Sequence, residues 1–578
     1  MKKKLDYNKY IKLRNKYESI VNRFSNIRMI MFIIMIISFI LKYYYYKLFF
    51  SVVFVISLVI FFIMVMVHDK YFKIYDYYIK YVSIIERYID MENGNWKNFS
   101  DTGSDFLDDN KMYLSDLDII GESSLFQYLS ICKTLGGRKK LISRLSNFYC
   151  NEKELINKQK MIVDLSNNIS FCIDFQIMMM EYEECLKDFD EFFIKNKKNS
   201  ISSLIIGILF SAIGISLFVL GLSNVISINY FYLMFLFNIL MSYMYFYISK
   251  DMFLKLDKFI NSYGKLINVF KLIGNYSASS IGMKKIVKNV ENNLDILNKL
   301  KKLDSINSLR NNLLSNFLLN GFICINLFIM YYYSLFINKY FNKLIDLVED
   351  IYELEASISL VGIGILKDNR CIPVLSDKVE LKFDNLKHPL IDENICTSND
   401  FDCDNGVNII TGSNMGGKTT FLRTIGINLI LMQAGTYVCS NSFISCYFKI
   451  FTSMRIRDDV NKGISTFYGE LLRIKDMVEY NGSGNMLVLV DEIFKGTNYN
   501  DRMYGAREVV NRLNNKSTLA FITTHDFELC DSEGVSNYHV KEDYEGEKII
   551  FDYKIRKGRC TSTNAKYLMG KLGIINIK

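Results

Sequence analysis

Three long stretches without a charged side chain limit what this chain can fold into more than any other feature. Residues 48–67, 199–249 and 311–338 contain no Asp, Glu, Lys or Arg. About 20 apolar residues in a helix cross the hydrocarbon core of a bilayer, and a soluble core rarely excludes charge over such lengths. The stretch 199–249 has room for two membrane-spanning helices around the sequence SNVISIN (residues 223–229).

Another apolar run precedes the first of these stretches. Residues 29–41 are apolar, and four tyrosines follow at 43–46. A basic start followed by an apolar run can imitate a signal peptide, but no small-residue cleavage site follows and a second apolar run does. We therefore predict an uncleaved transmembrane hairpin over residues 27–67 and a second hairpin over residues 201–249.

The charge of the N-terminal segment predicts the orientation in the membrane. Residues 1–28 carry nine Lys or Arg and two acidic residues. Their balance of +7 (9 − 2) is most of the chain's formal net charge of +9. The positive-inside rule then makes residues 1–26 a basic cytoplasmic tail, and such a tail suits anionic lipid better than it indicates nucleic acid. Four spans return the C-terminal half to the cytoplasm and five would export it, so we predict that residues 311–338 form a buried helix.

A nucleotide-binding loop follows in ITGSNMGGKTT (residues 410–420), which fits the pattern G-x-x-x-x-G-K-[ST]. An apolar strand precedes it and a helix follows, so the helix amides can face phosphate; an ordinary glycine-rich turn is the alternative. The predicted ATP-binding residues of the loop are Gly412, Ser413, Asn414, Met415, Gly416, Gly417, Lys418, Thr419 and Thr420.

Two later apolar strands end in residues that complete such a site. Asp491 follows MLVLV and is predicted to hold Mg²⁺ together with Thr419. Glu492 is the predicted base that polarises the attacking water. His525, after the strand TLAFITT, is predicted to sense the γ-phosphate, because open α/β sheets bind ligands at the carboxyl ends of their strands. The alternatives are an acidic pair that only starts a loop and a structural histidine.

These motifs resemble the ATPase domain of the MutS family of DNA mismatch-repair proteins. The resemblance rests on TGSNMGGKTT, FTSMRIRDDVNKGISTFYGEL, LVLVDEIFKGTN and TTHDFEL, which occur in the family's order, and on the tail GRCTSTNAKYLMGKLGI. It implies a homodimer in which Ser465 and Thr466 reach the partner's ATP, although they also suit a helix N-cap with Glu470 completing a capping box. LKHPLI (386–391) resembles the segment that borders the adenine, which implies a nucleotide contact for His388.

Upstream, residues 117–145 and 341–360 resemble the helical core, or lever, of the same family. The chain shows no Phe-x-Glu mismatch-reading motif near its start, so we expect a membrane-anchored member without the mismatch-recognition domain. DNA is a possible partner only through the resemblance. The twelve cysteines form no C-x-x-C pair and predict reduced thiols rather than a metal site.

The expected architecture is an α/β P-loop NTPase domain, similar to ABC ATPases, preceded by an all-α core with transmembrane hairpins. The predicted boundaries are 1–26 tail, 27–67 hairpin, 68–112 linker, 113–200 and 250–365 helical core, 201–249 second hairpin, and 366–578 ATPase. The expected protein is a multi-pass ATPase of the cytoplasmic membrane with its ATPase domain in the cytoplasm, coupled to DNA binding or repair. Two alternatives are a membrane mechanochemical ATPase without DNA and, less favoured because STFYGEL replaces an LSGGQ-like signature, half of an ABC transporter.

Overall fold

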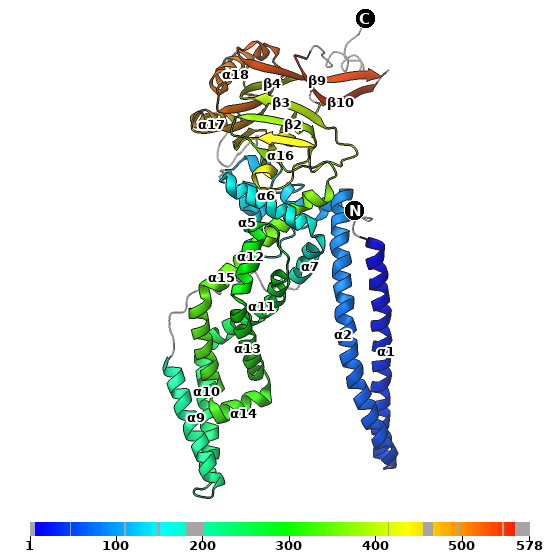
Figure 1. Cartoon of the computed structure of the whole chain (residues 1–578), viewed down its shortest axis with the longest axis vertical. Helices are drawn as coiled ribbons and strands as arrows, with labels where there is room; N and C mark the ends of the chain where they lie inside the picture. Colours follow the sequence, from blue (N-terminus) through cyan, green and yellow to red (C-terminus); the bar gives the residue numbers. More distant parts are fainter. Residues whose placement is uncertain are drawn as a thin grey trace.

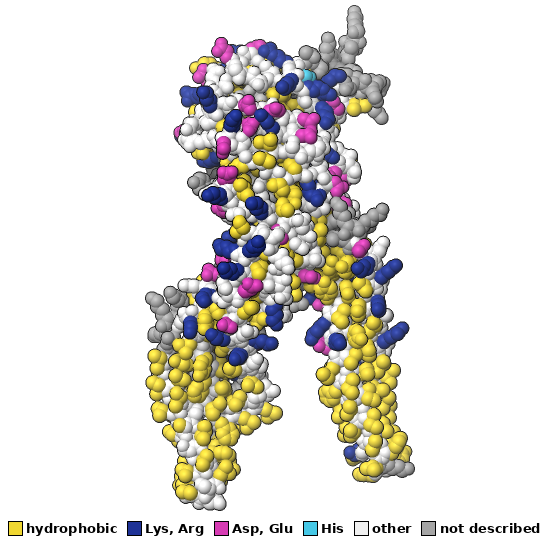
Figure 2. Space-filling view, viewed as in Figure 1, with side chains coloured by type: hydrophobic (Ala, Val, Ile, Leu, Met, Phe, Trp, Pro, Cys, Tyr) yellow, Lys and Arg dark blue, Asp and Glu magenta, His cyan; other side chains and the backbone are white. Residues whose placement is uncertain are grey.

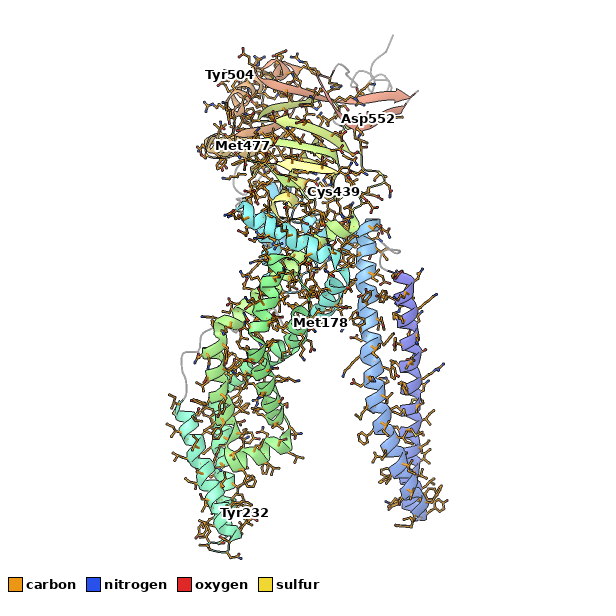
Figure 3. The ribbon with its side chains drawn as sticks, in the orientation of Figure 1. Met178, Tyr232, Cys439, Met477, Tyr504 and Asp552 are labelled. Carbon is orange, nitrogen blue, oxygen red and sulfur yellow. The ribbon has the colours of Figure 1, made fainter. Side chains whose placement is uncertain are left out.

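The computed structural model describes residues 6–46, 48–108, 111–146, 151–180, 201–413, 415–454, 466–494, 497–545 and 548–560. The chain forms an α/β head, a helical middle and two separate helical legs that extend from it in the same direction (Figure 1). Tyr232 lies at the far tip of one leg, and Tyr504 and Asp552 lie in the head at the opposite end of the molecule (Figure 3).

The head is built on a six-stranded sheet in the order β10-β9-β4-β8-β7-β6. All neighbouring strands are parallel except the β10–β9 pair. A smaller sheet has the order β1-β5-β2-β3. The strands are β1 (Val374–Leu375), β2 (Glu380–Leu386), β3 (Asn399–Asp404), β4 (Gly406–Thr411), β5 (Ser442–Ser445), β6 (Lys449–Ser453), β7 (Met486–Asp491), β8 (Thr518–Thr523), β9 (Val535–Glu545) and β10 (Lys548–Lys557).

The central strands are apolar on both faces because helices cover both. In β7, Leu487 and Leu489 join the hydrophobic cluster shared with α16 (Lys418–Gln433). Val488 and Val490 join the cluster on the other face, with α17 (Thr466–Tyr480) and α18 (Tyr499–Leu513). Successive side chains of a strand point to opposite faces, so a parallel sheet covered on both faces needs continuous apolar strands.

The helical middle lies directly beneath the head. It contains η1 (Asn95–Asn98), η2 (Ser104–Phe106), α3 (Tyr113–Asp116), α4 (Leu125–Leu129), α5 (Leu135–Ser146), α6 (Glu152–Asn167), α7 (Ile169–Met180), α11 (Lys250–Gly274), α12 (Ile281–Asn292) and α13 (Leu294–Asn311). A further short helix, η4 (Phe527–Asp531), follows β8 in the head.

One helix, α15 (Ile325–Leu366), runs from the second leg through the middle to the head. Its last turns are buried. There Glu355 accepts hydrogen bonds from the backbone N–H of Lys133 (2.8 Å) and from the hydroxyl of Thr134. Burial raises the pKa of the Glu355 carboxyl to about 7. Thr436 of the head donates to the carbonyl oxygen of Leu360 at 2.9 Å. Helix α15 is therefore hydrogen-bonded to both the helical middle and the head.

The two legs consist of helices that are long and apolar enough to cross a membrane. They are α1 (Tyr7–Tyr45) and α2 (Leu48–Asn93) in the first leg and α9 (Ile201–Leu222) and α10 (Asn229–Ile248) in the second. Hydrophobic side chains cover most of both legs, whereas charged side chains gather over the head and the middle (Figure 2). Helix α2 continues to Asn93, through the first part of the segment that was predicted to be a linker.

The prediction of one buried helix over residues 311–338 is wrong for the first part of that run. The run forms two helices, α14 (Leu313–Ile323) and the start of α15, which meet at an angle of 91°. Cys324 between them has a φ of 47°, and Leu313 and Leu314 of α14 are 86% and 77% exposed. The absence of charge predicts an apolar environment, but it predicts neither the break nor which face of each helix the protein buries.

Candidate functional site

The phosphate-binding loop lies between β4 and α16 at the carboxyl edge of the large sheet. Gly412 has a φ of 127°, and a Cβ atom there would lie 2.5 Å from a methyl carbon of Val540. Gly417 has a φ of 85° and precedes the first residue of α16. Both positions therefore require glycine. Asn414 lies outside the described residues, and Met415 is 71% exposed.

Lys418 is the first residue of α16, and its side chain is only 3% exposed. Its ammonium group donates to the carbonyl oxygens of Gly412 and Ser413, the latter at 3.2 Å, and lies 3.3 Å from Nε2 of His525. The positive charge thus lies over the loop, next to the N-terminal end of a helix whose dipole also favours an anion. This arrangement suits the outer phosphates of a nucleotide.

Thr419 and Asp491 bring a hydroxyl and a carboxylate together. The Thr419 hydroxyl donates to Asp491 Oδ2 at 2.7 Å, and Thr523 donates to Asp491 Oδ1 at 2.6 Å. Among the described residues, no group of three or more His, Cys, Asp or Glu side chains could hold a metal ion. Mg²⁺ is commonly held by one or two protein oxygens, with phosphates and water completing its shell, so this oxygen pair fits the ion beside bound phosphate.

Glu492 and His525 face each other next to that pair. Glu492 Oε1 lies 3.4 Å from Nε2 of His525. Burial and the neighbouring Lys418 charge lower the pKa of His525 below its usual value, so the imidazole is neutral at neutral pH. Glu492 adopts a φ of 58° and is held there because its N–H donates to the Thr523 hydroxyl at 3.0 Å. An uncommon backbone conformation of this kind is found most often at functional sites.

His388 lines a cavity of about 280 Å³ beside the first turn of α16. The cavity wall also contains Gly417, Thr420 and Tyr553. Burial lowers the pKa of His388 to about 3, and its Nδ1 accepts from the N–H of Leu390 at 3.2 Å. The histidine is therefore a neutral, fixed part of the wall. The cavity adjoins the phosphate loop, has a mixed polar and apolar lining, and is large enough for a flat base.

Tyr553 was not predicted from the sequence. It lies in an irregular part of β10, with a φ of 56°, and a Cβ atom added to Gly417 would lie 2.9 Å from its ring. Asn399 holds this irregularity, because its amide donates to the Tyr553 carbonyl oxygen at 3.1 Å and its oxygen accepts from the N–H of Ile555 at 2.8 Å. Nothing in the local sequence indicates that this tyrosine meets the loop.

Ser465 lies outside the described residues, and Thr466 is the first residue of α17. Glu470, one turn further, is 2% exposed and accepts a hydrogen bond from the N–H of Phe494 at 2.5 Å. Phe494 follows Asp491 and Glu492 closely in the chain. Helix α17 is therefore tied to the loop that carries the predicted base.

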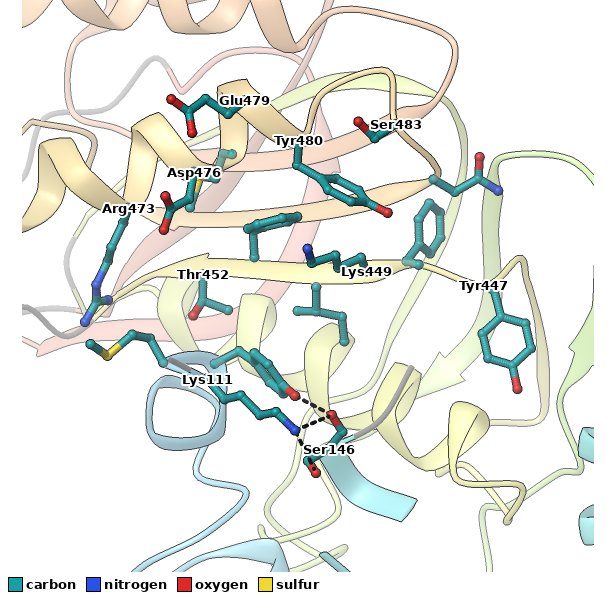
Figure 4. Close-up of a pocket in the computed structure, with 17 residues that line it drawn as sticks. Lys111, Ser146, Tyr447, Lys449, Thr452, Arg473, Asp476, Glu479, Tyr480 and Ser483 are labelled. Atoms are coloured by element: carbon teal, nitrogen blue, oxygen red, sulfur yellow. Dashed lines mark hydrogen bonds between the residues drawn. The ribbon is translucent and has the colours of Figure 1, made fainter. Parts of the chain in front are cut away.

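A buried carboxylate joins the helical middle to the head. Asp116 of α3 is fully buried, and its Oδ2 accepts from the Thr452 hydroxyl (2.7 Å), the Met454 N–H (3.3 Å) and the Arg473 guanidinium (2.8 Å). Arg473 and Thr452 lie on α17 and β6, along one wall of a cleft between the two layers (Figure 4). Two residues on, Asp118 accepts from Arg423 of α16 at 3.0 Å.

Comparison with known proteins agrees with this geometry. Residues 408–567 match MutS domain V. MutS domain V is an ATPase domain, and the C-terminal region of this chain, over roughly 240 residues, is homologous to it.

The chain is also similar to proteins named DNA mismatch repair protein MutS. It is 34% identical over 239 residues to the protein of Caldicellulosiruptor saccharolyticus, covering 38% of this chain and 27% of that protein. It is 33% identical over 236 residues to the protein of Staphylococcus haemolyticus, covering 38% and 26%. The similarity thus spans about a quarter of the length of these relatives.

Proposed function

We propose that this protein is a membrane-anchored ATPase that uses ATP and Mg²⁺ to move its helical middle and legs relative to one another. One observation carries the proposal. Lys418, the Thr419–Asp491 pair and the Glu492–His525 pair converge at one sheet edge, in a domain that Asp116 fastens to the helices.

In this proposal each group at the sheet edge has a separate task. Lys418 and the loop amides bind the phosphates, and Thr419 with Asp491 holds the ion that neutralises phosphate charge. Glu492 orients and polarises the attacking water. His525, neutral and within reach of both Lys418 and Glu492, contacts the terminal phosphate. His388 and Tyr553 border the adenine in the adjoining cavity.

The proposed output passes through α17 and the Asp116 contact. A displacement of the loop that contains Glu492 would move Glu470, because the Glu470 carboxylate accepts a hydrogen bond from the N–H of Phe494 in that loop. Glu470 and Arg473 share α17, and Arg473 binds Asp116 of the helical middle. From there α15 leads to the second leg. In this proposal a small displacement at the nucleotide becomes tilting of this long helix.

We further propose that the active form is a homodimer and that the legs are membrane anchors. By resemblance to MutS-type pairs, in which a Ser-Thr-Phe loop serves the partner's ATP, we assign that task to Ser465 and Thr466; Thr466 is the first residue of α17. The four candidate spans, together with the basic N-terminal tail, favour a multi-pass protein of the cytoplasmic membrane whose head lies in the cytoplasm.

DNA is a second candidate partner, because the relatives quoted above are named DNA mismatch repair proteins. Binding to plain and mismatched duplexes, measured across a range of salt concentrations, tests it, since the slope of affinity against salt reports contacts to backbone phosphates. Tight binding with a steep slope supports a DNA partner. No binding at low salt leaves the ATPase proposal intact and removes DNA.

ATP turnover by the full chain in liposomes tests the main proposal. The wild-type protein should hydrolyse ATP in the presence of Mg²⁺, and Lys418→Ala should remove that activity. Lys516→Ala is the matched control, since this lysine lies near the opposite end of β8 and should have no effect. Turnover that survives in Lys418→Ala would refute the assignment of the site.

A further inference from the structure

The break between α14 and α15 is an unusual feature of the second leg. Helix α13 descends from the middle of the molecule, α14 lies across the lower ends of α13 and α15, and α15 returns towards the head (Figure 1). No residue from 311 to 338 is charged. The run is thus apolar enough for a membrane, yet it turns by 91° where an ordinary span would continue straight.

The position of the break can be measured along α9. A Cβ atom added to Gly207 would lie 3.2 Å from the ring of Phe328, and one added to Gly214 would lie 3.7 Å from the carbonyl oxygen of Phe322. These two phenylalanines flank Cys324. At 1.5 Å per residue, Gly207 and Gly214 lie about 9 and 20 Å from the start of α9 in a helix of about 33 Å. The break therefore lies beside the middle of a candidate membrane span.

Side chains of α10 and α14 satisfy the backbone at the break. The Asn238 amide donates to the carbonyl oxygen of Gly321 at 2.9 Å. The Asn320 side-chain oxygen accepts from the N–H of Asn326 at 3.2 Å and from the hydroxyl of Ser242. Asn238, Asn320 and Ser242 are completely buried. Backbone groups freed by a helix break in lipid need internal partners. Asn238 and Asn320 supply them, and Ser242 fixes the Asn320 side chain.

The opposite face of α14 is apolar and uncovered. Leu313 and Leu314 are 86% and 77% exposed, and Phe317 and Leu318 are 47% and 51% exposed. In water this face would expose a row of large apolar side chains. The exposed side chains of α9 and α10 are of the same kind, so the apolar surface of the leg continues over α14.

Both ends of the broken run return to the same side. Just before α14, Arg310 is 6% exposed and pairs with Asp257 of α11. On the other arm, the ring of Tyr333 in α15 packs against Phe259 of α11, with centroids 5.7 Å apart. Helix α11 starts where α10 ends and leads into the helical middle. The two arms of the run therefore contact the same helix on the side of the head.

We propose that α14 and the first turns of α15 form a re-entrant element, which enters the acyl-chain layer beside α9 and α10 and leaves it on the same face. The occupant of the exposed face of α14 is the hydrocarbon of the lipid. This inference rests on the proposed membrane anchoring. A re-entrant element leaves the head on the side of the membrane where four spans place it. Besides the two hairpins, a third apolar segment then enters the bilayer, at the end of α15, the helix that leads to the ATPase domain.

Quenching of tryptophan fluorescence by lipids brominated on their acyl chains tests the proposal. The chain has one tryptophan, Trp96, which is buried, so Trp96→Phe provides a silent background. Leu318→Trp reports on α14, Leu209→Trp on α9, and Ile281→Trp on α12; all three native side chains are at least half exposed. We expect the α14 and α9 reporters to be quenched to a similar extent and the α12 reporter to be unaffected.

The outcomes separate the two ideas. Quenching of the α9 reporter without the α14 reporter would overturn the re-entrant element and leave the anchoring in place. If neither is quenched, the anchoring itself fails. A second measurement uses the chain with Trp96 intact. Ser308→Cys and Lys339→Cys place a cysteine at exposed positions of α13 and α15. Each variant is treated with a membrane-impermeant maleimide, and the labelling of each cysteine-containing peptide is measured separately. Both should react from the head side, and reaction from opposite sides would mean that the run crosses the membrane.

Discussion

The contact between Asp116 and α17 gives a direct prediction about how the helical middle is coupled to the head. Asp116 is fully buried and accepts three hydrogen bonds from the head, one of them from the Arg473 guanidinium, whose side chain is 16% exposed. Removing one partner of a buried ion pair costs about 3–5 kcal/mol. Asp116→Ala should therefore lower the free energy of unfolding by about that amount.

The control lies on the same helix. Lys475 and Glu479 of α17 form an ion pair of 3.5 Å with both side chains more than 60% exposed. Exposed pairs contribute about 0–1 kcal/mol, so Glu479→Ala should change stability by no more than that. The assay is denaturant unfolding of the detergent-solubilised chain followed by circular dichroism, with ATP turnover measured on the same samples.

A double-mutant cycle then assigns the effect to the pair. Asp116→Ala and Arg473→Ala in one chain should cost clearly less than the sum of the two single changes, with a coupling in the range of about 0.5–3 kcal/mol seen for contacting residues. Additive costs, or a cost for Asp116→Ala no larger than that for Glu479→Ala, would refute the view that this carboxylate joins the layers.

Three further predictions concern the nucleotide site. Glu492→Gln should retain ATP binding but slow hydrolysis by orders of magnitude, because only the base is removed; near-normal turnover would mean that another group positions the water. The pKa of His388 is about 3 in the folded protein and near 6.5 in the unfolded chain. The stability that its neutral side chain contributes is therefore fully present above pH 6.5 and is lost as pH falls towards 3. From pH 7.5 to 5 the free energy of unfolding of the wild type should fall by about 2 kcal/mol relative to that of His388→Gln, a comparison in which Glu355 and the other groups common to both chains cancel; melting curves at the two pH values can check it. Ser465→Ala and Lys418→Ala, each inactive alone, should partly restore turnover when mixed in one membrane, and no gain despite demonstrated subunit mixing would exclude a site shared between subunits.

The sequence by itself determined the parts of the site that depend on neighbouring residues. The loop 412–419 requires glycine at fixed spacing, because consecutive backbone amides must turn inward around phosphate. The apolar strands before Asp491 and His525 specify buried parallel strands, and strands of that kind bring their carboxyl ends to one edge. Local chemistry therefore predicted which residues would meet there.

Only the tertiary structure decided which distant groups complete these elements. Asp116 and Arg473 are 357 residues apart, and no local pattern distinguishes this aspartate from one in a turn. The same is true of Tyr553, whose place over Gly417 depends on an irregular strand held by Asn399.

The apolar run 311–338 illustrates the limit most clearly. Its lack of charge indicated an apolar environment, but an asparagine in such a run looks the same whether the helix continues or breaks. The break depends on Asn238 and Ser242 of α10, 83 and 78 residues away from the groups they bind. Hydrogen-bond partners supplied from another helix satisfy the polar groups at such a break, and those partners are specified by packing rather than by the order of residues.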